Sequence, residues 1–352
     1  MSDRLHSAKN LLTALSFVAL VALPVLLHLA RQNPVDAGAE NRRLAPPPSL
    51  AGMRADWAAF PDTVNAWMRD HFGMRRTYLQ IGFEMDKVLR SSAAFKAVRG
   101  DDGWLFNTLN GALALHRGLL PFAAGEAGAW LDGLDQIQVR AEAAGAVFIA
   151  AIAPNKHTIY PEYLSAYPRR VAGETRLDEV QRLARARGLP LIDLRPALLA
   201  AKSDTKVYYQ TDSHWTDLGA YHGFRELRRA LTDRGIAVPD IPQGALRLRL
   251  KDDFRGDLYG LLGEENGAPE TVTLVKRPDL AGPKAGRILI IGDSFTAQIR
   301  KYFAATFETV DVIDNAAGAP DLSHLRPGAY DVVLFEIVER YLSRPLTPRS
   351  GN

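Results

Sequence analysis

The sequence of 352 residues contains no cysteine, which excludes disulfide bonds and metal sites built on thiolates. It also has little excess charge, because 43 basic side chains are set against 40 acidic ones, for a formal net charge of +3. Such a balance is untypical of proteins that bind nucleic acids. No Gly-rich phosphate loop, internal repeat or HExxH-type histidine pair is present. We therefore expect no nucleic-acid partner, no cofactor and no metal.

What the sequence does have is one long apolar run near its N-terminus. Residues 11–30 include no Asp, Glu, Lys or Arg, and a helix of twenty residues matches the hydrocarbon core of a membrane. Arg4 and Lys9 precede the run and, by the positive-inside rule, stay in the cytoplasm. We expect residues 1–10 to be cytoplasmic and residues 11–30 to be an uncleaved signal-anchor. A cleaved signal peptide remains the alternative.

The rest of the chain predicts one large α/β domain. Residues 31–52, rich in Pro, Ala and Gly, predict a linker; residues 53–345 form the expected domain, and 346–352 a tail. Helical spacing predicts two helices over residues 55–98. Continuous apolar runs further on are typical of buried parallel strands, with helices between them. Strands are predicted at 146–153, 190–194, 206–209, 288–291, 309–313 and 331–337, and about five of them would form the sheet.

The strongest chemical signal is Arg287–Phe295, RILIIGDSF. Four aliphatic residues predict a strand, Gly292 and Asp293 break it, and helical spacing resumes at Phe295. A serine on a tight turn between strand and helix is a nucleophile elbow, in which free N–H groups at the helix start could bind an oxyanion. The alternative is that Ser294 only caps the helix.

A second stretch, YYQTDSHWTDLG at 208–219, supplies partners for this serine. A hydrolytic Ser needs a base, and the base needs a carboxylate to hold its tautomer. Asp212 and His214 fit these roles on a loop before a helix that starts near Thr216. The alternative readings are that Asp212 caps this helix, or that Asp212, His214 and Asp217 bind a cation. We expect a Ser294–His214–Asp212 triad and no metal.

Four further residues are weaker candidates for substrate binding. Lys156 follows the strand at 146–153, and ligands of α/β sheets bind at the carboxyl ends of strands. Tyr259 lies in the irregular segment 239–286, which is typical of a lid or binding loop. Arg340 follows the last strand and could orient the site or pair with Glu336. The fourth candidate, Asn315, is taken up below.

The motifs GDSF and TDSHW together resemble the SGNH-hydrolase-like O-acetyltransferases of the alginate-acetylation (AlgJ/AlgX) type. The likeness extends over residues 40–342 and includes ENRRLAPPP, RDHFGMR, GDDGWLF, APNKHTIYPEYL and VERYL. It implies a permuted SGNH fold, since the Asp–His pair precedes the serine here and follows it in ordinary SGNH hydrolases. The Asn-containing oxyanion block of those hydrolases is absent, which leaves Asn315 or backbone N–H groups as the second oxyanion donor.

The resemblance implies O-acetylation of an exported polysaccharide through an acetyl-serine. It also implies a single-pass inner-membrane protein with a periplasmic domain, supplied with acetyl groups by a membrane-bound O-acyltransferase. The residues alone indicate only acyl-serine chemistry. A carbohydrate esterase or deacetylase with the same triad is therefore one alternative. A non-catalytic component of an exopolysaccharide secretion complex is another.

Overall fold

The computed structural model describes residues 45–57, 60–71, 96–169, 171, 173–264, 266–315 and 317–349. The chain divides into two compact units. The first comprises Met1–Phe95 with Tyr259–Asn266, and the second comprises Lys96–Leu258 with Gly267–Asn352. The predicted domain limits, which treat residues 53–345 as one domain, stay a prediction.

The described part of the first unit contains two N-terminal helices, α2 (Leu50–Ala55) and α3 (Phe60–His71). Helix α2 begins inside the predicted linker because Ser49 caps it, its hydroxyl accepting the N–H of Gly52 at 3.0 Å. Helix α3 falls within the first predicted helix, while the second predicted helix and the apolar run at 11–30 lie outside the described residues. Among the residues that are described, no helix is long and apolar enough to cross a membrane.

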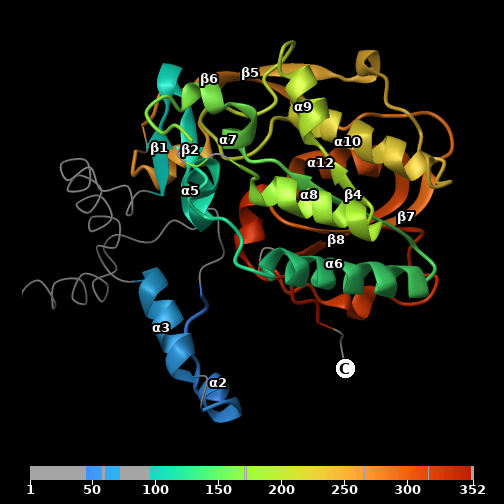
Figure 1. Cartoon of the computed structure of the whole chain (residues 1–352), viewed down its shortest axis with the longest axis horizontal. Helices are drawn as coiled ribbons and strands as arrows, with labels where there is room; N and C mark the ends of the chain where they lie inside the picture. Colours follow the sequence, from blue (N-terminus) through green and yellow to red (C-terminus); the bar gives the residue numbers. More distant parts are fainter. Residues whose placement is uncertain are drawn as a thin grey trace, which may run out of the picture. The chain divides into compact units, whose positions relative to one another are not determined.

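A parallel five-stranded sheet forms the centre of the second unit, in the order β4-β3-β9-β7-β8 (Figure 1). Its strands are β3 (Val147–Ala153), β4 (Leu191–Asp193), β7 (Ala285–Gly292), β8 (Phe307–Asp314) and β9 (Val332–Val338). Strands β3, β7 and β9 are almost wholly apolar and buried, as expected for strands covered on both faces, whereas the edge strand β8 carries charged residues and is mostly exposed.

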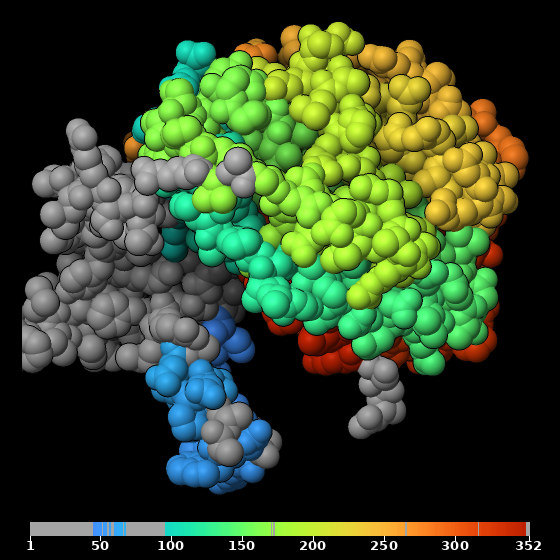
Figure 2. Space-filling model, viewed as in Figure 1, coloured from blue at the N-terminus to red at the C-terminus, as the bar shows by residue number. Residues whose placement is uncertain are grey.

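Helices cover both faces of this sheet. One face is packed by α6 (Glu126–Ala143) and α8 (Arg176–Arg187), and the other by α9 (Arg195–Ala201), α10 (Asp217–Thr232) and α12 (Thr296–Thr306). On the side shown in Figure 2, residues of α6, α8, α9 and α10 lie at the surface. The predicted α/β fold with a parallel sheet between helices is therefore confirmed.

The strand predicted at 206–209 does not form. Tyr208 instead makes an isolated bridge with Trp215, and the carbonyl of Val207 accepts the N–H of Thr216 at 3.0 Å. The backbone of the segment thus bonds partly within its own loop and partly to side chains of other segments, rather than along the sheet. This closed loop carries Asp212 and His214.

Smaller elements complete the second unit. The segment 239–286, expected to be irregular, contains an antiparallel strand pair, and its first strand is largely exposed, including Leu248 and Leu250. The two strands are β5 (Leu248–Phe254) and β6 (Glu270–Val275). The remaining elements are β1 (Ala97–Arg99), β2 (Leu105–Asn107), α5 (Ala112–His116), α7 (Lys156–Ile159) and α11 (Asp257–Leu261), of which α11 continues into the first unit.

Candidate active site

The strand, turn and helix predicted around Ser294 are present, with the turn at the carboxyl end of β7. Ser294 is exposed, while Asp293 before it and Phe295 after it are buried. The Asp293 carboxylate accepts N–H groups of Phe295 and Val338, both at 2.8 Å, which ties the turn to the end of β9. Gly292 is required here because a Cβ would lie 2.1 Å from Oγ1 of Thr296. The turn therefore presents one hydroxyl from a rigid base.

Only part of the helix start is available to bind an oxyanion. Helix α12 begins at Thr296 with Phe295 as its N-cap, so Ser294 does not cap it. The N–H groups of Phe295 and Thr296 are both taken by Asp293, through its side chain and its carbonyl. Within the described chain, the N–H of Ser294 has no acceptor. It is thus the backbone donor left free beside the hydroxyl.

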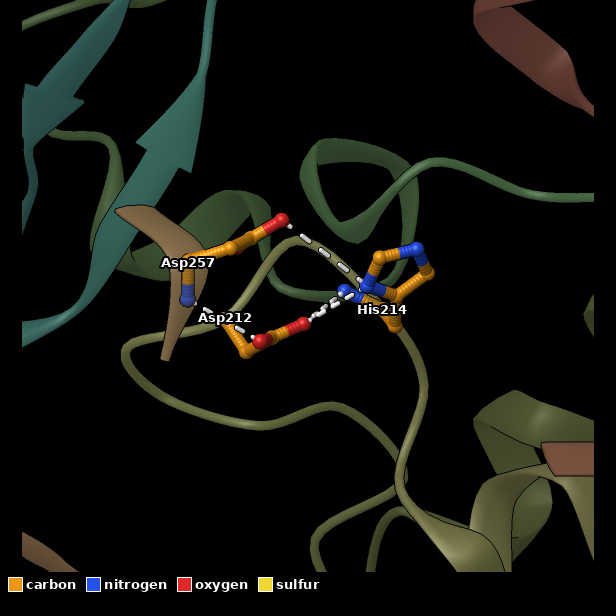
Figure 3. A group of neighbouring side chains, drawn as sticks. All are labelled: Asp212, His214 and Asp257. Atoms are coloured by element: carbon orange, nitrogen blue, oxygen red, sulfur yellow. Dashed lines mark hydrogen bonds and ion pairs between the residues drawn. The ribbon is translucent and has the colours of Figure 1, made fainter. Parts of the chain in front are cut away.

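His214 joins Ser294 to Asp212. Its Nε2 lies 2.8 Å from Oγ of Ser294, and its Nδ1 lies 2.7 Å from Oδ1 of Asp212. The two ring nitrogens are thus turned to opposite sides, with the Asp212 side visible in Figure 3. The ionised carboxylate can only accept, so it holds the proton on Nδ1 of the neutral ring and leaves Nε2 as an acceptor that faces the hydroxyl of Ser294.

Asp212 serves this loop and not the following helix. Helix α10 is capped by Thr216, whose hydroxyl accepts the N–H of Gly219 at 3.0 Å, so the capping alternative for Asp212 is wrong. Oδ1 of Asp212 also accepts the backbone N–H of His214 at 3.0 Å. The loop is therefore folded around this carboxylate.

A second carboxylate, Asp257, stands beside the pair and was missed by the sequence analysis. It accepts the backbone N–H of Ser213 at 2.7 Å and its hydroxyl at 2.6 Å. Its Oδ2 lies 3.9 Å from Nδ1 of His214 (Figure 3). The preceding Gly256 allows this approach, since a Cβ there would lie 2.2 Å from backbone atoms of Thr211. The motif Arg-Gly-Asp was the available signal.

The electrostatics favour a basic imidazole. Burial lowers the pKa of His214, but the hydrogen bond and charge of Asp212 and the charge of Asp257 outweigh it, so the pKa lies above its usual value. Burial raises the pKa of Asp212, yet its bonds to His214 and to the N–H of Asp257 bring it below the usual value. Burial and the neighbouring charge of Asp212 raise the pKa of Asp257.

The same three groups are close enough to be cation ligands, but their oxygens already have partners. One ligand atom from each of Asp212, His214 and Asp257 lies within 4.8 Å of the others. A cation would have to replace the hydrogen bonds to Ser213 and to His214 that are described above. The predicted alternative with Asp217 is wrong, because that carboxylate pairs with Lys301 at 2.6 Å instead.

Comparison with known families gives this arrangement its context. Residues 97–310, more than half of the chain, match the family described as "SGNH hydrolase-like domain, acetyltransferase AlgX". The chain belongs to this family. The match includes Asp212, His214, Asp257 and Ser294 and ends before β9. The predicted family and enzyme class, an SGNH-like O-acetyltransferase, are thereby confirmed.

Individual relatives agree with the AlgX family assignment. The chain is 26% identical over 306 residues to a probable alginate O-acetylase AlgJ of Pseudomonas syringae pv. tomato, covering 78% of this chain and 76% of that protein. A probable AlgJ of Pseudomonas putida is 25% identical over 305 residues, covering 77% and 76%. The solved O-acetyltransferase domain of Pseudomonas putida AlgJ superposes with a TM-score of 0.50 at 22% identity, covering 71% and 92%, and shares the fold.

Lys156 was expected to bind substrate, but its ammonium is bonded to the protein backbone. Its side chain is buried, and its ammonium donates to three backbone carbonyls, those of Leu105 at 2.6 Å, Tyr209 at 2.9 Å and Gln210 at 3.2 Å. Burial lowers its pKa to about 7, against the opposing charges of Asp212 and other acids. An ammonium has three donors, so none remains for a sugar or acyl oxygen. Lys156 therefore holds the loop that leads to Asp212.

Two of the three remaining substrate-binding candidates, Tyr259 and Asn315, lie at different places in the fold. Tyr259 is in α11 and is 7% exposed, which leaves little of its ring to stack on a sugar. Asn315 follows β8, is buried, and donates its backbone N–H to the carbonyl of Gly292 at 2.7 Å. It lines a cavity of about 10 Å³ with Trp130 and Tyr341, room for about one water. Both roles stay predictions.

Proposed function

We propose that this enzyme transfers acetyl groups to hydroxyls of an exported polysaccharide through an acetyl-Ser294 intermediate. The observation that carries the proposal is the continuous hydrogen-bonded relay from Ser294 through His214 to Asp212. Its first step is attack of Oγ of Ser294 on the carbonyl carbon of an acetyl ester or thioester. Nε2 of His214 takes the hydroxyl proton and returns it to the leaving group as the donor bond breaks.

The second step reverses the roles of the partners. A sugar hydroxyl attacks the acetyl-serine, His214 takes its proton, and the bond between the acetyl carbon and Oγ breaks. His214 then returns the proton to Ser294, so one acetyl group has been exchanged for one proton. The free N–H of Ser294 points to one donor for the oxyanion in both steps.

Asp212 and Asp257 support both steps through His214. Their negative charges raise the pKa of the imidazole and stabilise the imidazolium that forms transiently. Asp212 acts by direct contact with Nδ1, while Asp257 acts mainly by holding Ser213 between the two triad residues of the loop. Neither carboxylate needs to be protonated for the cycle to run.

The choice of a polysaccharide acceptor follows the relatives named alginate O-acetylase. The apolar run at 11–30 supports an inner-membrane anchor with the catalytic unit in the periplasm. A donor delivered across the membrane by a membrane-bound O-acyltransferase suits this location. A hydrolase is the second candidate function, because Ser294 is exposed and water could reach its acetyl ester.

The test is to incubate the purified protein with an activated acetyl ester, with and without an oligosaccharide. Wild type should gain a single acetyl group by mass spectrometry and pass it to the sugar, whereas Ser294→Ala should gain none. Release of acetate alone in the presence of sugar would indicate the hydrolase. An equal adduct on the Ala variant would refute Ser294 as nucleophile, and no adduct on wild type would favour a scaffold.

The control variant should alter a serine outside the relay. Ser203→Ala is suitable, because Ser203 is exposed at the end of α9 and bonds only to its neighbours there. It should acetylate as wild type does. Melting temperatures of all three proteins should agree, since one exposed oxygen is lost at each site.

A further inference from the structure

An arginine beside the turn of Ser294 has no hydrogen-bond or ion-pair partner among the described residues. Arg340 follows β9, the strand next to β7, and its guanidinium carbon lies 5.3 Å from the ring centre of Phe295. That ring in turn lies 5.0 Å from the imidazole of His214. The carboxyl ends of neighbouring parallel strands therefore bring Ser294 and Arg340 to the same edge, where ligands of such sheets bind.

The guanidinium is buried yet makes no hydrogen bond or ion pair with any described residue. Arg340 as a whole residue is only 6% exposed, and its guanidinium lies over the rings of Phe295 and Tyr341. Its nitrogens are not among the sealed atoms of the described chain that lack a partner, so they retain contact with solvent. Arginine has five N–H donors, and a buried arginine normally pairs them with an anion.

None of the nearby carboxylates bonds to Arg340, although Oε1 of Glu336 is buried and has no hydrogen-bond partner among the described residues. Oε2 of Glu339 accepts from Asn155 and Thr158, at 2.7 and 2.6 Å. Glu336, the pairing partner considered from the sequence, accepts instead from Thr296 at 2.9 Å, and the expected Arg340–Glu336 pair does not form. Both carboxylate oxygens of Asp293 accept backbone N–H groups. Arg340 makes no hydrogen bond to Asp293, and its charge acts on the pKa of that carboxyl only from a longer distance.

A second arginine, Arg344, also lies over the ring of Tyr341, and its guanidinium has a hydrogen-bond acceptor. Arg344 stacks on Tyr341 with its guanidinium carbon 4.2 Å from the ring centre, against 5.5 Å for Arg340. Its Nη2 donates to Oδ1 of Asn110 at 2.6 Å. The contrast is that Arg344 has a hydrogen-bond acceptor in addition to its ring contact, whereas the donors of Arg340 have none among the described residues.

We propose that Arg340 is an anion-binding residue of the acetyl-transfer site, which receives a negatively charged oxygen of the bound ligand. This inference rests on the proposed function and extends it. Two sources can offer that oxygen: a carboxylate on the sugar acceptor, as in a uronic-acid polymer, or the oxyanion that forms when the acetyl carbonyl is attacked. Arginine suits either, since its planar fork can donate two parallel bonds to one anionic group.

The experiment compares Arg340→Gln and the matched control Arg344→Gln with wild type. Each protein is assayed with neutral 4-nitrophenyl acetate as donor and two acceptors of the same length, an oligouronate and its carboxyl-reduced neutral form. If Arg340 binds the acceptor carboxylate, Arg340→Gln should raise KM for the oligouronate about 10- to 100-fold and leave the neutral acceptor unchanged. If it binds the oxyanion, acetylation of Ser294 should slow about 10²- to 10³-fold whatever the acceptor.

Arg344→Gln should differ little from wild type in every assay. The inference is overturned if Arg340→Gln acetylates Ser294 and both acceptors within two-fold of wild type, with at most a lower melting temperature. Where wild type itself forms no acetyl adduct, the proposed function has failed independently. Titration calorimetry with the oligouronate then decides, because equal binding by wild type and Arg340→Gln would remove Arg340 as an anion site.

Discussion

The backbone N–H of Asp257 donates to Oδ2 of Asp212 at 3.0 Å, on the side away from His214. Oδ1 of Asp212 meanwhile accepts both the ring and the backbone N–H of His214. In each of these three hydrogen bonds, the carboxylate of Asp212 is the acceptor. An amide in its place would bring an N–H against an N–H in either orientation, which makes the site sensitive to the charge of residue 212 and to the segment that carries residue 257.

The first prediction concerns Asp212→Asn. If the amide N–H faces His214, the wrong tautomer is favoured; if it faces Asp257, a buried donor loses its acceptor. In both cases the charge that supports the imidazolium is lost. We expect the acetyl-transfer rate to fall by up to about 10⁴-fold, as for the corresponding substitution in serine proteases. Transfer rate and melting temperature are measured together, with Asp233→Asn at the exposed end of α10 as control.

A rate for Asp212→Asn within a few-fold of wild type would remove this residue from the mechanism. The remaining machinery would then be a Ser294–His214 dyad. A large rate loss that accompanies gross unfolding of the variant would neither support nor contradict a role of Asp212 in the mechanism. A crystal structure of the variant would then show whether His214 still faces Ser294.

The pH dependence of activity in the Asp257→Asn variant tests the effect of the second carboxylate on His214. The charge of Asp257 helps to hold the pKa of His214 above its usual value, and the imidazole acts as a base only when neutral. Activity should therefore rise as pH increases through the pKa of His214. Removing the charge lowers that pKa, so the acidic limb of the profile should move to lower pH. Asp212 also raises this pKa, while Arg340 lowers it, and both are retained in the variant.

The measurement is the rate of Ser294 acetylation between about pH 4 and 9 for wild type and Asp257→Asn. An unchanged limb with a reduced plateau would assign Asp257 to holding Ser213 alone. A shift to higher pH would contradict the electrostatic argument. Asp240→Asn, a variant of an exposed carboxylate that pairs with Arg228, provides the control.

Lys156→Met separates support of the loop from substrate binding. The variant leaves three carbonyls without their donor, and unpaired buried groups cost roughly 1–3 kcal/mol each. Relief from burying the ammonium offsets part of this loss. We expect the free energy of unfolding to fall by about 3 kcal/mol. Denaturant titration measures it, and Lys202→Met, which alters a partly exposed lysine, is the comparison.

KM for the acceptor should change little in Lys156→Met protein that remains folded. A substrate-binding lysine would give the opposite pattern, a raised KM at unchanged stability. That result would assign Lys156 to substrate binding, which is the role expected from its place after β3.

The last prediction concerns residues 11–30. Their uninterrupted apolar character predicts an uncleaved helix with the N-terminus in the cytoplasm. The full-length protein should sediment with the inner membrane and keep Met1 or Ser2 as its first residue. A soluble periplasmic product that starts near Glu40 would identify the run as a signal peptide.

Local patterns were enough to predict much of this protein. Four aliphatic residues before Gly-Asp-Ser predict a buried strand and a sharp turn, because few other conformations suit that order of residue types. Asp-x-His predicts a short-range pair, since two residues of loop can close a carboxylate onto an imidazole. The three central strands β3, β9 and β7 were found for a similar reason, since each contains a continuous apolar run.

What the tertiary structure alone decided are contacts between segments far apart in the chain. His214 meets Ser294 across 80 residues, and Asp257 reaches the loop of Asp212 from 45 residues away. The buried position of Lys156 and the unpaired guanidinium of Arg340 likewise depend on which chain segments surround them. A sequence lists the donors and acceptors of each side chain, but only packing determines which of them are already used. That difference separates a lysine that supports a loop from an arginine that remains open to a ligand.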